Sequence, residues 1–328
     1  MKNENTKGLR EGAMAVALTA VLMLLTRFMP LFSLVGNFVC GIPLATVAAR
    51  NNIKTIIITF VAAFVVAILI NGSLISAATI LLMSCIPGGI AGYMMGKRKP
   101  FFATLFVTCL AVCAGWIFEI VMLEMVLGTG IAEMLAEVMA QTKTMMSAVL
   151  NAMGDKISGQ TAVSPQQLLD TLLASTEAIL RLYFPSFVIA SSMITGYIII
   201  RISGFVIRRT KLANVDIVEF SLLKAPRSMS IAALLFYAIY IFMNSESNIF
   251  PMFANVVFIL YMILGICGLS VVDFKFKTKI RSAAARFAIY ILVFMFGGIF
   301  VSIISTILIF IGIMDAGRDF RQIGNYGV

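Results

Sequence analysis

The chain contains no histidine, and only 12% of its 328 residues are charged. Soluble globular proteins carry about 25% charged residues, so this shortage excludes a soluble enzyme, a disordered chain and a coiled coil. The absence of histidine removes the commonest general base and the commonest neutral metal ligand. The sequence also has no Walker motif and no HExxH motif. We therefore expect no enzyme activity, no catalytic residue, no cofactor and no metal site.

The chain lacks paired cysteines as well. Its five cysteines lie in apolar runs and none belongs to a CxxC pair: Cys40, Cys85, Cys109, Cys113 and Cys267. Cys109 and Cys113 share a helix face, but no histidine or third cysteine lies near them. A free cysteine behaves as a small hydrophobic residue, so we expect buried thiols.

Apolar sequence is what the chain has in abundance: 61% of its residues are hydrophobic, and the mean hydropathy is +1.03. A membrane-spanning helix needs about 20 apolar residues. The apolar runs predict spans over residues 12–30, 31–49, 55–70, 73–95, 101–127, 183–207, 229–243 and 251–272. With the last run added, we expect an all-α polytopic membrane protein of about 8–10 transmembrane helices plus an external amphipathic helical hairpin.

The last apolar run, residues 287–314, is long for one span and short for two. Gly297-Gly298 near its middle is compatible with a kink or with a tight hairpin. A single span would place Arg318 and Arg321 outside the cell, whereas a hairpin returns them to the cytoplasm. We favour the hairpin, although each half is shorter than a normal span.

Lysine and arginine give the chain a formal net charge of +10 and are unevenly distributed between the predicted loops. With the N-terminus in the cytoplasm, most of them fall in cytoplasmic loops and few in the opposite loops. Because these charges lie in short loops between apolar runs, we expect them to face a lipid bilayer and not nucleic acid. The sequence therefore predicts a multi-pass protein of the bacterial plasma membrane with a cytoplasmic N-terminus.

The polar stretch 128–182 has the periodicity of two amphipathic helices. Apolar residues recur at helical spacing from Ile131 to Met153, and Gly154 is a candidate helix end. Ser164, Pro165 and Gln167 then form the signature of a second helix start. This pattern predicts an external helical hairpin, either a connector lying on the surface or a lid over the bundle mouth.

Several ionisable and polar residues fall near the outer ends of four predicted spans. An ionisable side chain at hydrocarbon depth costs at least about 2.5 kcal/mol, so each one needs a partner or a purpose. They form either a ligand pocket open to the outside or an interfacial ion pair beside an ordinary aromatic belt. The predicted ligand-binding residues are Arg27, Asn71, Trp116, Glu119, Glu124 and Arg181.

Three aspartates, Asp273, Asp315 and Asp319, sit beside basic residues at predicted span ends. We expect neighbouring cations to neutralise them there, since a lone charge is costly near the membrane core.

Small residues line one flank of two predicted spans. Ala13 and Ala17 form a small-xxx-small pair, which permits close approach of another helix. The partner is either a neighbouring span of the same chain or a separate membrane subunit. Pro87 is followed by a similar small flank formed by Gly88, Gly89, Gly92 and Gly96.

Two stretches carry a family resemblance. The first is residues 10–100, REGAMAVALTAVLMLLTRFMPLFSL…GIPLATVAARNNIKTIIITF…LLMSCIPGGIAGYMMGKRKP. The second combines VEFSLLKAP (218–226), GICGLSVVDFKFK (265–277) and IGIMDAGRDFRQ (311–322). Together they resemble the YybS-like family of bacterial multi-span proteins, a domain-of-unknown-function family, over nearly the whole chain.

The first six spans are also similar to the substrate-binding S component of energy-coupling factor (ECF) transporters. This similarity implies a ligand near the outer face beneath covering loops. It also implies that small residues on the first span, here Ala13 and Ala17, dock a transmembrane coupling subunit that works with ATPases.

The sequence thus predicts four segments: an S-component-like core of five spans at 1–127, the hairpin at 128–182, a sixth span at 183–209, and a cytoplasmic loop with C-terminal spans at 210–328. The first functional hypothesis is binding or transport of a small solute in the manner of an ECF S component. The second is a non-transporting membrane scaffold in envelope or division processes, which binds partners through the hairpin and the loop 208–228.

Overall fold

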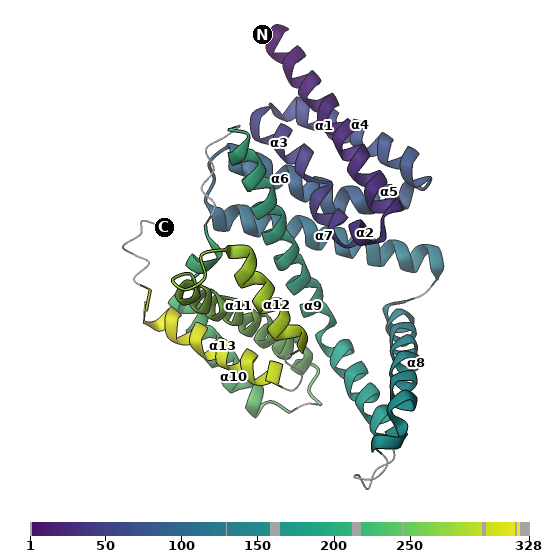
Figure 1. Cartoon of the computed structure of the whole chain (residues 1–328), viewed down its shortest axis with the longest axis vertical. Helices are drawn as coiled ribbons and strands as arrows, with labels where there is room; N and C mark the ends of the chain where they lie inside the picture. Colours follow the sequence, from purple (N-terminus) through teal and green to yellow (C-terminus); the bar gives the residue numbers. More distant parts are fainter. Residues whose placement is uncertain are drawn as a thin grey trace. The chain divides into compact units, whose positions relative to one another are not determined.

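The computed structural model describes residues 2–128, 130–157, 165–211, 218–244, 246–296, 300–318 and 320–321. Every regular element in this described part is helical (Figure 1), which confirms the prediction of an all-α protein. Seven of these helices are long and apolar enough to cross a membrane, and Arg227–Phe242 and Ala283–Phe294 are shorter apolar helices. The architecture is that of a polytopic helical membrane protein.

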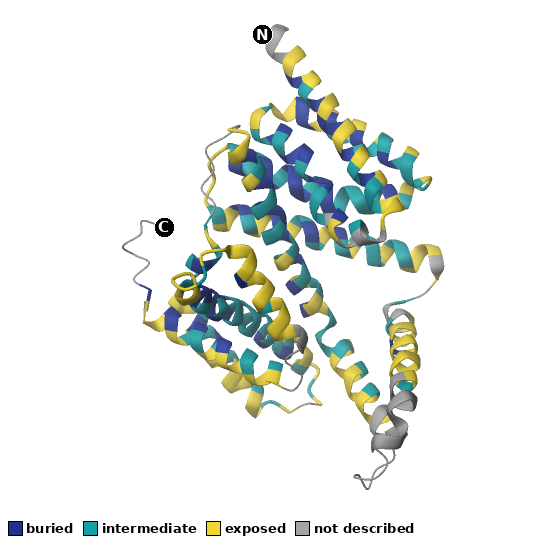
Figure 2. Ribbon diagram, in the orientation of Figure 1, coloured by how far each residue is buried: buried dark blue, intermediate teal, exposed yellow. Residues whose placement is uncertain are grey.

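Exposed residues lie on helices throughout the described chain (Figure 2), and many of them are large and apolar. Leu69 is 78% exposed, Phe106 65% and Phe242 89%. Soluble monomers rarely leave wide apolar patches open to water. These surfaces therefore suit contact with lipid.

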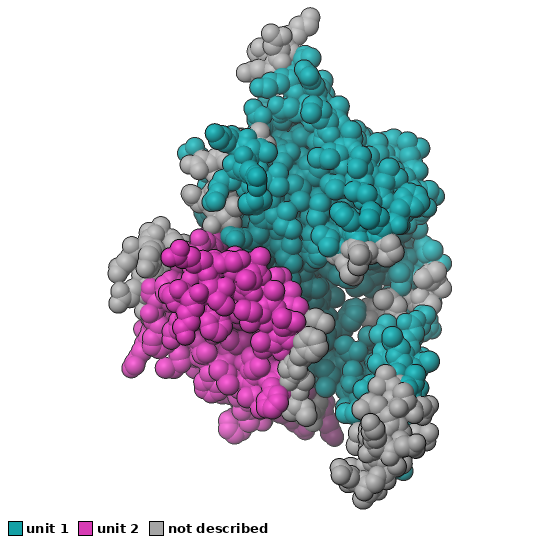
Figure 3. Space-filling model, in the orientation of Figure 1, with its two compact units in different colours: residues 1–216 teal, residues 217–328 magenta. Residues whose placement is uncertain are grey.

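The chain divides into two compact units, Met1–Asp216 and Ile217–Val328 (Figure 3). The first six predicted spans and the predicted hairpin belong to the first unit. The second unit contains the remaining apolar helices.

The first unit opens with α1 (Lys2–Phe28), α2 (Pro30–Val39), α3 (Ile42–Arg50) and α4 (Ile53–Asn71). The single span predicted at 31–49 is wrong, because the chain is broken at Cys40 and Gly41 into two short helices. The reason is local: Pro43 lies in the first turn of α3, where its missing N–H is tolerated, so a helix starts here instead of continuing.

The next apolar run folds as α5 (Leu74–Ile80), a π-helical turn η1 (Leu81–Cys85) and α6 (Ile86–Gly96). Pro87 follows the wide turn and cannot donate a backbone hydrogen bond into the preceding turn. A single π-helical turn within an α-helix is a rare feature that often marks a functional position.

The glycine flank of α6 packs against α3. A methyl group on Gly92 would lie 2.1 Å from the carbonyl oxygen of Ala45, and one on Gly96 would lie 2.2 Å from that of Ala49. The small residues therefore serve close helix packing inside the first unit.

The unit continues with α7 (Phe101–Leu127), α8 (Ile131–Ile157) and α9 (Pro165–Arg209). The predicted second hairpin helix and the sixth span, divided at 182/183, are parts of one unbroken helix, because α9 runs through 45 residues. The change in hydropathy near residue 183 is a change in surroundings and not a helix end. Pro185 lies inside α9 without ending it. Ser164, the predicted N-cap, lies outside the described residues.

The second unit contains η2 (Phe220–Leu222), α10 (Arg227–Phe242), α11 (Phe250–Phe276), α12 (Ala283–Phe296) and α13 (Phe300–Gly317). The predicted run 287–314 thus forms parts of two helices, and Gly297-Gly298 between them lies outside the described residues. Gly265 of α11 lies beside Ile309 of α13. Arg321, just beyond α13, reaches Ser270 near the end of α11. The two helices therefore run in the same direction, so α12 must lead the chain back between them, as in the favoured hairpin.

Candidate functional site

The predicted residues Arg27 and Asn71 lie at the adjacent ends of α1 and α4. The Arg27 guanidinium donates to the carbonyl oxygen of Ile70, and its side chain is exposed. The Asn71 amide donates to the carbonyl oxygen of Ala67 at 2.8 Å. Both side chains therefore bond to backbone at the end of α4.

Three predicted residues lie on α7, and they differ in burial. The Trp116 indole N–H is buried and has no hydrogen-bond partner among the described residues. Glu119, one turn later, is half-buried, and Glu124 is exposed. Arg181 is on α9, where it forms an exposed ion pair with Glu177 at 2.8 Å.

The six residues thus belong to two groups with different neighbours. The helix that carries Arg27 packs mainly on α2, α3 and α4, whereas α7 packs mainly on η1, α6 and α9. The structure brings Arg27 to the end of α4 beside Asn71, and it keeps Trp116 and Glu119 together on α7. A single pocket formed by all six residues stays a prediction.

The structure reveals a contact between two interrupted helices that was not predicted. Gly41, at the break between α2 and α3, lies against the π-helical turn so closely that a methyl group on it would be 2.2 Å from the carbonyl oxygen of Ser84. The Ser84 hydroxyl is fully buried and has no hydrogen-bond partner among the described residues. Breaks in membrane helices free backbone polar groups, and transporters often place substrate at such breaks.

The helix α7 contacts the same π-helical turn. A methyl group on Gly115 would lie 3.1 Å from the backbone of Leu82. This contact brings the turn of α7 that carries Trp116 against the segment that carries Ser84. Two buried polar groups without partners in the described chain, a hydroxyl and an indole N–H, therefore lie on elements that meet here. A buried unpaired polar group costs about 1–3 kcal/mol, so it calls for an explanation.

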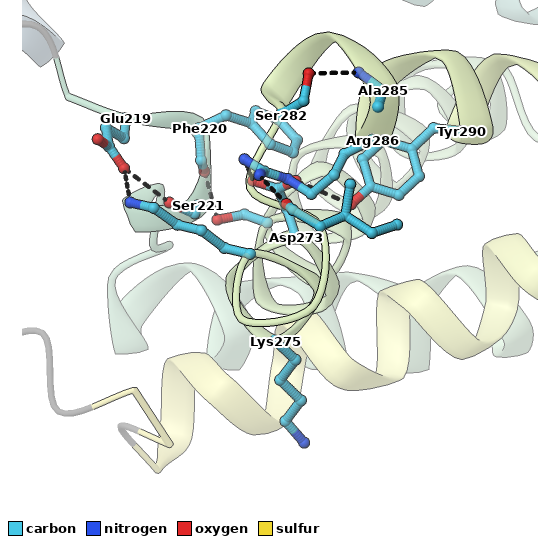
Figure 4. A network of polar contacts seen from close by, with 12 residues as sticks. Glu219, Phe220, Ser221, Asp273, Lys275, Ser282, Ala285, Arg286 and Tyr290 are labelled. Atoms are coloured by element: carbon cyan, nitrogen blue, oxygen red, sulfur yellow. Dashed lines mark hydrogen bonds and ion pairs between the residues drawn. The ribbon is translucent and has the colours of Figure 1, made fainter.

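The second unit holds a buried ion pair at the end of α11 (Figure 4). The Arg286 Nε lies 2.6 Å from Asp273 Oδ1, and both side chains are less than one tenth exposed. The Tyr290 hydroxyl donates to the same carboxylate at 2.9 Å. Arg286 also donates to the carbonyl oxygens of Ile280 and Arg281. In Figure 4, Lys275 points away from this network.

A second buried pair lies within the same unit. The Arg321 guanidinium is 2.7 Å from Asp315 Oδ2, with side-chain exposures of 2% and 1%. Arg321 also donates to the Ser270 hydroxyl and to the carbonyl oxygens of Ser221 and Leu223. It thereby ties α13, α11 and the segment before α10 together.

These pairs confirm that Asp273 and Asp315 are neutralised by basic residues, while Asp319 lies outside the described residues. Their partners are Arg286, which the sequence analysis counted only among the loop cations, and Arg321, which lies in the quoted motif at 311–322. The motifs that carried the family resemblance contain Ser221, Ser270 and both aspartates. These motifs were therefore the sequence signal that could have pointed to the two buried ion pairs.

Within the described part of the chain, no three His, Cys, Asp or Glu side chains lie close enough to hold a metal ion. An apolar hollow of about 430 Å³ lies at the end of α10, and none of its lining residues was predicted as a site residue: Ala238, Ile239, Phe242 and Met243.

The described part of the chain has seven helices that can cross a membrane, and its buried charges are paired at helix ends. These features define a polytopic membrane protein. The chain belongs to the family described as Predicted membrane protein (DUF2232), whose profile matches residues 17–316. That range includes the contact at Ser84 and both buried aspartates. No curated protein and no solved structure matched the chain.

Proposed function

We propose that the first unit binds a small solute within the membrane, where the α2–α3 break meets the π-helical turn. The observation that carries this proposal is the fully buried Ser84 hydroxyl, which has no partner among the described residues and lies against Gly41. A bound molecule with hydrogen-bond acceptors would satisfy this hydroxyl and the indole N–H of Trp116. The half-buried Glu119 carboxylate, one turn along α7, would add an acceptor for a donor group on the solute.

The wider predicted site remains part of this proposal. At the helix ends, four predicted residues would guide the solute, as in an ECF S component: Arg27, Asn71, Glu124 and Arg181. Ala13 and Ala17 are exposed on α1, which leaves their small flank open to a coupling subunit. Such a subunit, with its ATPases, would supply the energy, because the chain has no Walker motif of its own. The proposed setting is the bacterial plasma membrane, with the N-terminus in the cytoplasm.

The test uses the single tryptophan of the chain, Trp116, as a built-in fluorescent probe. Purified full-length protein is titrated with vitamins and with metal ions while tryptophan emission and thermal unfolding are recorded. We expect one class of solute to shift both signals. Ser84→Ala should weaken binding of that solute about tenfold, the equivalent of one lost hydrogen bond of about 1.4 kcal/mol.

Ser192→Ala is the matched control. Ser192 is also buried, but its hydroxyl donates to the carbonyl oxygen of Val188 at 2.7 Å, so it has its partner already. Binding should survive this change. The proposal is wrong if no solute shifts the wild-type signals, or if Ser84→Ala binds as tightly as wild type. If the protein is purified without any associated ATPase module, only the ECF-like part of the proposal is wrong, and the proposal of solute binding stands.

A membrane scaffold is the second candidate function. The observation in its favour is the exposure of α8 residues Val138 and Met145, which are 50% and 73% exposed. Under this hypothesis, crosslinking in cells recovers protein neighbours at the hairpin, and Glu119→Ala leaves the cellular function intact. Solute binding predicts the opposite result for Glu119→Ala.

A further inference from the structure

All the lysine and arginine residues of the second unit gather at one end of it. The helices α10 and α12 begin at this end, and α11 and α13 finish at it. Contacts hold the segments together there: Lys277 after α11 pairs with Glu219 before α10, and Asp273 of α11 pairs with Arg286 of α12. We call this region the basic end, and it comprises residues 219–227, 273–287, 315–318 and 320–321.

The acidic residues described at the basic end already have basic partners. The two buried aspartates of the unit are held by arginines, as shown above. The other described acid at this end, Glu219, is paired with Lys277. Five further basic side chains are exposed and form no ion pair with a described acid: Arg227, Lys275, Lys279, Arg281 and Arg318. Their positive charge is therefore not balanced by the described part of the chain.

The opposite end of the unit has no basic residue. The connection between α10 and α11 has one charged residue, the exposed Glu246, and residues 297–299 between α12 and α13 are uncharged. The second unit is therefore polarised, because unbalanced positive charge lies at one end only.

Three phenylalanines are exposed at the basic end. Phe276 is 39% exposed at the end of α11, Phe287 is 64% exposed near the start of α12, and Phe320 is 55% exposed just after α13. Exposed rings beside exposed cations are typical of surfaces at a membrane interface, where rings reach the acyl chains and cations stay among the headgroups. Both kinds of side chain then have matching surroundings in one place.

The helices α11 and α13 bring the basic end to the headgroup region. Both are long and apolar enough to cross a membrane. Lys275 lies in the last turn of α11, and Arg318 directly follows α13. A basic cluster next to a membrane-spanning helix attracts anionic lipids, because their negative headgroups lie at the surface that the cluster contacts.

We propose that the basic end binds the phosphate groups of anionic phospholipids and enriches these lipids around the second unit. Lys279 and Arg281, at the turn between α11 and α12, contact the headgroups, and Phe287 contacts the acyl chains. This inference does not depend on solute binding at Ser84, since it concerns the other unit.

The test uses full-length protein in which Trp116→Phe has removed the only native tryptophan. In this background, Phe287→Trp reports on the basic end. Phe300→Trp is the matched control, because Phe300 is 68% exposed and begins α13 at the opposite end. Each variant is reconstituted in equal parts of phosphatidylglycerol and phosphatidylcholine, with bromine on the acyl chains of one lipid or of the other. Quenching of tryptophan fluorescence then gives the local ratio of the two lipids.

We expect phosphatidylglycerol to be enriched about threefold over phosphatidylcholine at Phe287→Trp and not at Phe300→Trp. High salt should reduce the enrichment, because the Debye length falls from about 10 Å at 0.1 M to about 3 Å at 1 M. Equal quenching of Phe287→Trp by the two brominated lipids overturns the proposal. Absence of quenching by either lipid also overturns it, and would assign the basic end to a soluble acidic partner.

Two double variants identify the charges responsible. Lys279→Gln with Arg281→Gln removes two unbalanced cations and should lower the enrichment about twofold. Glu219→Gln with Lys277→Gln removes the neighbouring ion pair without changing the net charge, so the enrichment should stay at the wild-type level. Unchanged helix content by circular dichroism shows that the variants fold. The proposal fails if the two double variants behave alike.

A competition experiment separates lipid from free phosphate. Inorganic phosphate at the concentration of the lipid should leave the enrichment at Phe287→Trp intact, because the lipid is held by its acyl chains as well as by its headgroup. If inorganic phosphate abolishes the enrichment, the basic end binds free phosphate and the assignment to lipid is wrong.

Discussion

Gly268 of α11 and Gly312 of α13 face each other at the point where the two helices meet. A methyl group on Gly268 would lie 1.8 Å from the carbonyl oxygen of Leu308, and one on Gly312 would lie 2.0 Å from that of Leu264. The two helix backbones therefore touch directly, which only glycine allows at this separation. The contact fixes α13 beside α11 and brings Arg321 within reach of Ser270.

Gly268→Ala should therefore destabilise the protein by about 1–3 kcal/mol, because the helices must separate to admit the methyl group. Gly265→Ala is the control, since a methyl group there would meet Ile309 Cγ1 at an ordinary 3.5 Å. Denaturant unfolding in detergent compares the two variants. Equal stability of the two would contradict the direct backbone contact.

Arg321→Ala should cost about 3–5 kcal/mol, because it leaves the buried Asp315 carboxylate without its cation. Lys277→Ala removes an exposed pair with Glu219 and should cost no more than about 1 kcal/mol. Thermal unfolding of the two variants measures the contrast. A loss for Arg321→Ala as small as that for Lys277→Ala would show that the buried pair contributes little.

Arg286→Leu should loosen the turn between α11 and α12, because Arg286 holds the carbonyl oxygens of Ile280 and Arg281. The turn contains Lys277, Lys279 and Arg281, so trypsin should cut it faster in this variant. Tyr290→Phe removes only one hydrogen bond to Asp273, worth about 0.5–1.5 kcal/mol, and should leave cleavage nearly unchanged. If both variants are cut at the wild-type rate, the anchoring role of Arg286 is wrong.

The positive-inside rule predicts opposite sides for the hairpin and for the turn after α11. A cysteine at Thr144 should react with an impermeant maleimide on intact cells, and one at Lys279 only after lysis. Both positions are exposed in the structure. The reverse pattern of labelling would invert the proposed orientation.

Most of the helices are predictable from the sequence because a bilayer demands long apolar runs, and neighbouring cations were expected to neutralise Asp273 and Asp315 because lone charges are costly there. Sequence reasoning did not identify Arg286 or Arg321 as the partners. The Arg321 side chain reaches backbone about 100 residues earlier in the chain, at Ser221, and such contacts leave no local pattern.

Two other features escaped sequence reasoning for physical reasons. An unpaired hydroxyl at Ser84 is a property of its tertiary surroundings, so nothing in the adjacent residues distinguishes it from a bonded serine. The continuity of α9 was missed because hydropathy changes near residue 183, and that change reports the solvent around a helix and not its backbone.

The short helices of the second unit have a consequence for the lipid around them. At about 1.5 Å per residue, the 16 residues of α10 extend about 24 Å and the 14 residues of α12 about 21 Å. Both fall short of a hydrocarbon layer about 30 Å thick, so a helix of this length crosses the bilayer only where the acyl chains compress or headgroups are drawn inward. The energetic penalty of such a crossing grows with bilayer thickness, so a second unit that spans with these helices would suit thin membranes better than thick ones.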